Sequence, residues 1–319
     1  MTKGKSMRRL IIKRFLAVIP MLFGITFLSF ALMHLAGSDA VLERVDASGV
    51  LMSAEAIDAQ RAALGLNDPF LIQYLRWLGD FLHGDLGVSY VSGEDVIATF
   101  FSKLPATLLL TGLSIALTVA VSVPLGVLAA VRQHGATDWL IRAASFVGNS
   151  LPNFFVALLL MYLFSIRLPI FPVIAEGTGL ASAVLPSLTL AIAMSAKYLR
   201  QVRAAVLEEM GKPYVLAARA RGIPFRTTLV KSVLRVCLST IMTLLAMSIG
   251  SLLGGTVVVE TIFLWDGVGK LAMDAIEMRD YPMIQAYVVW MALIYLLVNL
   301  VADLVQLVLD PRLREEGER

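Results

Sequence analysis

Residues 104–131 read LPATLLLTGLSIALTVAVSVPLGVLAAV and contain no Asp, Glu, Lys or Arg. A helix needs roughly 20 apolar residues to cross the hydrocarbon core of a bilayer. Lipid cannot satisfy backbone N–H and C=O groups, so an uncharged stretch of this length is expected to be helical. This stretch alone therefore predicts one membrane-spanning helix.

Five further stretches share this property. They are residues 15–37, 143–166, 177–196, 236–259 and 281–302. The whole chain is 58% hydrophobic and 16% charged, whereas soluble domains carry about 25% charged residues. A buried core helix would explain any single stretch, but a soluble chain of 319 residues could not hide six of them. The sequence therefore predicts an all-α integral membrane protein with six transmembrane helices.

The first stretch has some features of a secretory signal peptide. Six basic residues lie within residues 1–14, and the small residues Ala36, Gly37 and Ser38 close the stretch. A signal core usually has about 7–15 apolar residues, which is shorter than 15–37. We therefore predict that 15–37 stays in the protein as the first transmembrane helix.

The positive charges between the six stretches are distributed unequally. If the stretches cross in turn, one side of the membrane receives 20 of the 27 Lys and Arg residues and the other receives seven. Cytoplasmic segments are the ones enriched in Lys and Arg. Both ends of the chain, residues 1–14 and the tail 310–319, are therefore predicted to be cytoplasmic.

The segment 38–103, called the outer segment below, is predicted to be external. It contains ten Asp and Glu residues against four Lys and Arg residues. Apolar residues recur at helical spacing in Ser53–Leu64, which Ser53 would cap, and in Phe70–Leu82. The sequence Leu66-Asn67-Asp68-Pro69 predicts a turn between them. We expect a small helical cap here, followed by a five-helix core over 104–309.

The sequence contains no set of residues that would predict an enzyme. The phosphate-binding pattern G-x-x-x-x-G-K-[ST] is absent, so the chain is not expected to hydrolyse ATP. His34, His83 and His134 are far apart in sequence and predict no metal site. Cys237 lies in an apolar stretch, where a cysteine packs as an inert side chain. We predict no catalytic residue, no cofactor and no nucleic-acid partner for this chain.

The segment 197–235, called the basic loop below, is the most distinctive part of the predicted cytoplasmic side. It carries nine basic and two acidic residues, and glycines and prolines bracket Tyr214–Arg221. That leaves room for about two helical turns. A helix held in this way suits docking on a soluble partner, whereas the alternative is a basic helix on anionic lipid headgroups. Depending on its rotation, the contact face or the packing would come from Tyr214, Val215, Ala218 and Arg221.

Within this loop, the sequence Leu216-Ala217-Ala218-Arg219-Ala220-Arg221-Gly222 resembles the docking element of ABC importer permeases, a Glu-Ala-Ala...Gly pattern. Leu216 stands where the generic pattern has Glu, a departure that is common in the peptide-importer branch. The run Ala218–Gly222, followed by a basic stretch, is typical of that branch. The branch usually continues with Leu-Pro, where this chain has Leu238-Ser239-Thr240.

The resemblance covers nearly the whole chain. The similar segments, in shared order, are residues 64–69, 73–74, 84–87, 104–107, 122–126, 152–154, 254–256, 260–263, 265, 267–269, 279–282 and 309–312. Asp266 stands where the family often has Pro. On these segments the chain is identified as a member of the dipeptide, oligopeptide and nickel class of ABC importer permeases.

The resemblance implies a division of labour between subunits. A second homologous permease would complete the pathway, two cytoplasmic ATPase subunits would hold ATP and magnesium, and an external binding protein would deliver the cargo. The chain itself would lie among the lipids of a bacterial inner membrane. The residues expected to couple it to the ATPase are Tyr214, Ala217, Ala218, Arg219, Arg221 and Gly222.

Three residues of the similar segments, Glu260, Trp265 and Asp280, have two interpretations. They would form an external gate or a contact with the binding protein, or they would stabilise their own loops. The expected cargo is a peptide or a nickel or other metal chelate, and the middle and carboxyl-terminal segments are closer to the nickel branch. A gated channel or a secondary transporter is the rival function, although no charged pair lies centrally in any of the six stretches.

Overall fold

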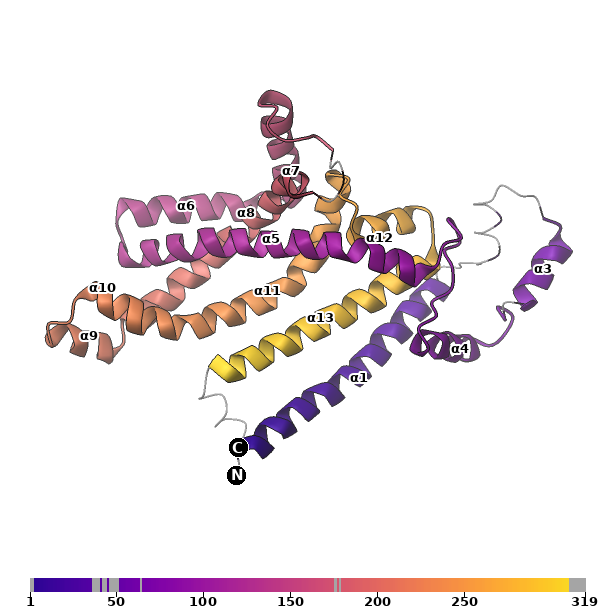
Figure 1. Cartoon of the computed structure of the whole chain (residues 1–319), viewed down its shortest axis with the longest axis horizontal. Helices are drawn as coiled ribbons and strands as arrows, with labels where there is room; N and C mark the ends of the chain where they lie inside the picture. The colour runs from indigo at the N-terminus through magenta and orange to yellow at the C-terminus, as the bar shows by residue number, and fades with distance from the viewer. Residues whose placement is uncertain are drawn as a thin grey trace. The chain divides into compact units, whose positions relative to one another are not determined.

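The computed structural model describes residues 3–35, 41, 45, 52–63, 65–174, 177 and 179–309. Most of these residues form helices (Figure 1). The β pairing found among them is one isolated bridge between Val88 and Asp95. The all-α prediction is therefore confirmed for the described chain. The chain divides into two compact units: unit 1 contains Leu108–Trp265, and unit 2 contains Arg8–Thr107 with Asp266–Leu296.

Five helical spans are long and apolar enough to cross a membrane. They lie in α1 (Lys3–Leu35), α5 (Val96–Val131), α8 (Leu180–Met210), the run from α10 (Phe225–Thr228) through η2 (Leu229–Val233) into α11 (Leu234–Ile262), and α13 (Tyr281–Leu309). Each of these helices or helical runs, taken over its full length, contains one of the charge-free stretches or most of it. The long apolar runs of the sequence therefore form the long helices of the structure.

The stretch 143–166 does not form the single straight helix that its length predicts. It is shared between α6 (Ala136–Ser150) and a second helical segment made of α7 (Asn153–Met161) and η1 (Tyr162–Arg167). The axis of this second segment is bent by 101° from that of α6. Pro152 causes the break, because a proline disfavours helical geometry in the residue before it. Leu151 is accordingly extended, with ψ 131°. The chain has six spans if this bent pair crosses the membrane as one.

In unit 1, α8 is the central helix and contacts α6, α7 and α11. Its buried side includes the small residues Ala183, Ser187, Ala191 and Ser195, which allow helices in membranes to approach closely. One close approach is at Gly126 of α5, where a Cβ would lie 2.9 Å from the Cβ of Val202. Gly126 is therefore required by packing rather than by backbone conformation.

In unit 2, the outer segment contains the two short helices that the sequence predicts. Helix α3 spans Ala54–Ala63, and the Ser53 hydroxyl accepts a hydrogen bond from the Ala56 N–H at 3.3 Å, as an N-cap does. Helix α4 spans Phe70–Leu82, the predicted bounds. Helix α12 (Val268–Glu277) is fixed at its start, because the Val268 N–H donates to the Thr107 hydroxyl at 2.9 Å.

Candidate functional site

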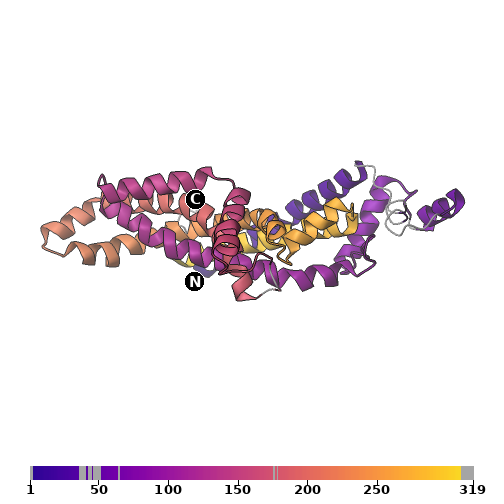
Figure 2. The same ribbon diagram turned by 90° about the horizontal axis from the view of Figure 1, so that it is seen from above.

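The basic loop is mostly helical in the structure. Helix α8 continues to Met210, beyond its apolar run, and is followed by α9 (Pro213–Ala220), α10 and η2. Figure 1 and Figure 2 both show the α9–α10 turn projecting at the end of unit 1 where α5 leads into α6. A short helix is therefore presented at one end of the bundle, as a docking element would be.

One side of α9 is anchored in the core of unit 1. Val215 is buried in a cluster with Val206 of α8, Val233 of η2 and Cys237 of α11. Ala218, one turn further along, is only 6% exposed. Of the two roles left open for Ala218, contact or packing, this burial favours packing inside the chain, and its part in coupling to the ATPase stays a prediction.

The end of α9 is a Schellman motif. Gly222 has φ +78°, its N–H donates to the Arg219 carbonyl at 3.0 Å, and the Ile223 N–H donates to the Ala218 carbonyl at 3.1 Å. A left-handed residue at this position is usually glycine, because other residues meet steric strain there. Gly222 therefore ends the helix and sets the direction of the following chain, and this structural role accounts for the glycine.

The start of α9 is tied to the end of α8 through Glu209, which is buried. Lys212 forms an ion pair with Glu209, and the Tyr214 hydroxyl hydrogen-bonds with the same carboxylate. Burial, followed by this hydrogen bond, raises the pKa of Tyr214 to about 12. Tyr214 therefore stays protonated at physiological pH and holds α9 on α8, while part of its ring remains at the surface.

The outward side of α9 and the turn after it combines apolar and basic side chains. Leu216 is 63% exposed, and Ile223 and Phe225 are also exposed. Ala217, Arg219 and Arg221, three of the predicted coupling residues, are exposed. Neither arginine has an ion-pair partner within the described ranges. Protein interfaces favour such apolar centres with arginine nearby, so this side suits a partner with an apolar and acidic surface.

A buried ion pair ties α6 to α8. Arg203 binds both oxygens of Asp138, with Nε–Oδ1 2.7 Å and Nη2–Oδ2 2.8 Å, and the His134 N–H donates to Oδ2 at 3.1 Å. Asp138 is 1% exposed. The sequence analysis missed this pair, because its members are 65 residues apart and no local pattern links them.

The three residues predicted for an external gate or a binding-protein contact are all buried. Glu260 and Trp265 are 0% exposed and Asp280 is 5% exposed. Their burial favours the loop-stabilising interpretation over a contact with the binding protein, which is left as a prediction. A gating role stays a prediction. The described residues contain no group of three or more His, Cys, Asp or Glu arranged to hold a metal.

Asp280 fastens the outer segment to the start of α13. The Ser89 hydroxyl donates to its Oδ2 at 2.5 Å, and the Tyr90 N–H donates to its Oδ1 at 3.1 Å. Hydrogen bonds to charged groups contribute about 1.5–3 kcal/mol each. We therefore expect Asp280→Ala to speed amide hydrogen exchange at residues 85–95 by at least tenfold, measured by mass spectrometry.

A matched control for this change is Asp266→Ala. Asp266 pairs with Lys103 at 2.5 Å, but its side chain is 60% exposed, and exposed pairs contribute less than about 1 kcal/mol. Exchange at residues 85–95 should then stay near the wild-type rate. Equal exchange in the wild type and Asp280→Ala would show that Asp280 does not hold the outer segment.

Comparison with known sequences matches nearly the whole chain to one family. Residues 122–315 match the model described as a binding-protein-dependent transport system inner membrane component, and residues 7–111 match the model of the N-terminal part of such a component. The nickel import system permease protein NikB of Staphylococcus aureus strain MRSA252 is 38% identical over 304 residues, which cover 95% of this chain and 91% of NikB. NikB of strain USA300 is 38% identical over 301 residues, covering 94% and 90%.

Comparison with solved structures supports the fold. An inward-facing form of the MetNI methionine ABC transporter aligns with a TM-score of 0.56 and 17% sequence identity. The alignment covers 67% of this chain and 97% of that chain. A likeness at this level of identity concerns the fold alone.

Proposed function

Because this chain belongs to the family of binding-protein-dependent transport system inner membrane components, we propose that it forms half of the pathway of an ATP-driven importer for nickel or a nickel chelate. The chain is a multi-pass inner-membrane protein and a permease subunit rather than an enzyme. A second homologous permease would supply the other half. Two ATPase subunits and an external binding protein would complete the assembly.

The arrangement of α9 is the observation that carries the coupling to ATP. Its inner side, at Val215 and Ala218, is fixed in the core of unit 1, while Leu216 and Arg221 face outward. A helix with one anchored side and one free apolar and basic side fits a cleft on a rigid partner. We assign that cleft to the ATPase subunit, because the basic loop lies on the predicted cytoplasmic side.

The same contacts suggest how motion would pass into the membrane. ATP, bound with magnesium between the partner ATPase subunits, would draw them together and move α9. Val215 contacts the cluster formed by α8, η2 and α11, so these helices would move with α9. Arg203 would carry the motion from α8 to α6 through Asp138. The pathway between the two permeases would then open alternately to the two sides.

The cargo assignment rests on the similarity to NikB. Both relatives reported above carry the name nickel import system permease protein and match at least 94% of this chain. Cargo in such systems is selected mainly by the binding protein, so the permease needs only a pathway that accepts the released ion or chelate. Short peptides are the competing cargo within the same family.

The test is transport by the reconstituted importer in proteoliposomes with its binding protein outside and ATP inside. We expect radioactive Ni²⁺ to accumulate only with hydrolysable ATP, and unlabelled dipeptides in tenfold excess not to compete. Accumulation of a labelled dipeptide but not of Ni²⁺ would overturn the cargo assignment. Uptake of Ni²⁺ that is equal with and without ATP would instead support the channel or secondary transporter.

A further inference from the structure

Helix α4 in unit 2 has three distinct faces. Successive residues of a helix turn by about 100°, which sorts its side chains into an aromatic face, a leucine face and a polar face. The aromatic face is Phe70, Tyr74, Trp77 and Phe81, the leucine face is Leu71, Leu75, Leu78 and Leu82, and the polar face is Gln73, Arg76 and Asp80. By this spacing, the leucine and polar faces lie on nearly opposite sides of the helix.

The aromatic face packs on the membrane-spanning part of α1. Tyr74 is 0% exposed, and its hydroxyl lies 3.0 Å from the Thr26 hydroxyl. The ring of Phe27 lies 5.3 Å from that of Tyr74, and the ring of His34 lies 5.3 Å from that of Phe70. These α1 residues belong to the apolar span Leu16–Leu35. Helix α4 therefore lies beside α1 at a depth that belongs to the membrane.

The leucine face is left open within the described chain. Leu71 is 61% exposed, Leu75 58% and Leu82 74%. At the same depth, α1 exposes Leu28 at 62% and Leu32 at 59%. The open side of α4 therefore lies at a depth where its neighbour α1 also exposes leucine side chains. Water would be a costly neighbour for side chains of this kind.

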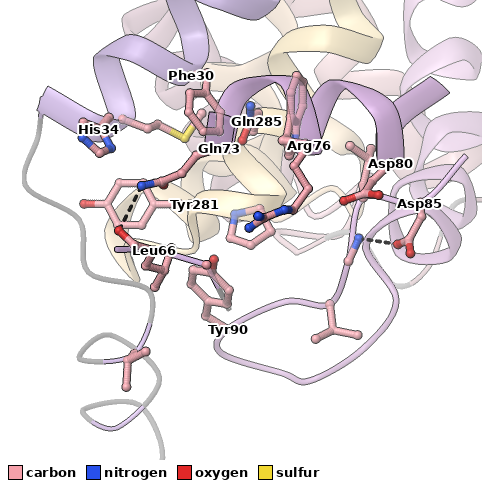
Figure 3. Close-up of a pocket in the computed structure, with 18 residues that line it drawn as sticks. Phe30, His34, Leu66, Gln73, Arg76, Asp80, Asp85, Tyr90, Tyr281 and Gln285 are labelled. Atoms are coloured by element: carbon pink, nitrogen blue, oxygen red, sulfur yellow. Dashed lines mark hydrogen bonds between the residues drawn. The ribbon is translucent and has the colours of Figure 1, made fainter. Parts of the chain in front are cut away.

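The polar face is occupied by groups of the outer segment. The Gln73 amide donates to the Leu66 carbonyl at 2.9 Å and to the Asp68 carbonyl at 2.8 Å, and Arg76 Nη2 pairs with Asp68 Oδ2 at 2.7 Å. Figure 3 shows Gln73, Arg76 and Asp80 along one side of α4, bordering a pocket of about 400 Å³. This side of α4 is therefore the one turned towards water.

We propose that α4 is an interfacial helix whose leucine face is embedded among the acyl chains of the leaflet on the outer-segment side. Its 13 residues measure about 20 Å, too short to cross a hydrocarbon core of about 30 Å, so the helix lies along the membrane rather than through it. An apolar face opposite a charged one is typical of such helices. Trp77 is partly exposed and is an aromatic side chain of the kind enriched at membrane interfaces.

Cys237 is the one cysteine of the sequence, so its removal allows a single introduced cysteine of this chain to be labelled. In a Cys237→Ala background, the fluorophore bimane is attached at Leu75→Cys or, as the matched control on the opposite side of the same helix, at Asp80→Cys. The full importer is placed in nanodiscs that contain lipids with a nitroxide on the acyl chain. We expect acyl-chain quenching to be at least threefold stronger at position 75 than at position 80, and iodide quenching from water to show the reverse order.

Two outcomes would overturn the proposal. Iodide quenching at position 75 as strong as that at position 80 would place the leucine face in water. Protection of position 75 from both quenchers, with or without the binding protein, would place it against another subunit. The result is independent of the proposed transport function, because an assembled importer that carries no Ni²⁺ still reports the depth of α4.

Discussion

Replacement of Asp138 by alanine is expected to lower the free energy of unfolding of unit 1 by about 3–5 kcal/mol, because removing one partner leaves a buried charge uncompensated. Arg203 donates two hydrogen bonds to Asp138, at 2.7 and 2.8 Å, and its side chain is only 18% exposed. The variant also frees the His134 N–H, which donates to the same carboxylate.

The measurement uses Cys237, the one cysteine of the sequence, which is 2% exposed in the core of unit 1. A thiol-reactive fluorogenic dye will label it only when unit 1 opens, so the labelling midpoint on heating reports the stability of that unit. We expect the midpoint to fall by roughly 10 °C for a loss of this size.

The control for this prediction replaces both partners. A buried ion pair exchanged for apolar residues of similar volume is often neutral in stability. Asp138→Leu with Arg203→Met should therefore recover most of the lost midpoint. A single Asp138→Ala variant that melts within about 2 °C of the wild type would show that the pair does not stabilise unit 1.

Leu216→Asp is expected to weaken the association of the permease with its ATPase subunits at least tenfold without changing the melting of unit 1. The side chain is 63% exposed and lies at the centre of the outward side of α9. Central apolar residues of an interface commonly contribute 1.4 kcal/mol or more, about a factor of ten in affinity. The affinity is measured in detergent by titrating the ATPase over permease that is immobilised on a surface.

The neighbouring residue provides the matched control, because it faces the other way. Val215 is 9% exposed and packs against Val206 and Val233, so Val215→Ala should cost about 1–3 kcal/mol of stability. Its folded fraction should still bind the ATPase. If Leu216→Asp binds like the wild type, α9 does not dock there, and the basic loop is better explained as a lipid-facing segment.

Comparing Arg221→Glu with Leu216→Asp in the same assay distinguishes the electrostatic contribution to docking from the apolar one. Charges at the rim of an interface act mainly on the association rate and on its dependence on salt. Arg221→Glu should therefore slow association, and the defect should shrink as salt is raised, whereas the defect of Leu216→Asp should persist. This difference would not arise if both residues only maintained the fold.

The sequence was sufficient for the features that depend on neighbours along the chain. Uncharged runs located the long helices, because a helix in lipid satisfies its own backbone and needs only enough apolar residues. The bounds of α4 and the Ser53 cap of α3 followed from local spacing and capping chemistry. The length of α9 followed from the glycines and prolines around it.

The sequence was insufficient wherever orientation mattered. Pro152 accounts for the break in 143–166, but the sequence does not give the 101° angle between the two halves. The rotation of α9 was equally open, because Leu216 and Val215 are both apolar and neither spacing nor charge distinguishes them. The contacts of Val215 with Val206 and Val233 decide it, and they turn Ala218 inward.

By itself, then, the sequence determined that this chain is a helical membrane protein with a short, bracketed helix in a basic loop, and its motifs placed it in an importer family. Only the tertiary structure decided which side of that helix is free, and which distant residues meet. Asp138 with Arg203 and Ser89 with Asp280 are 65 and 191 residues apart. The reason is physical: hydropathy and capping act within a few residues, whereas pairing across the fold depends on where the packing of whole helices brings each side chain.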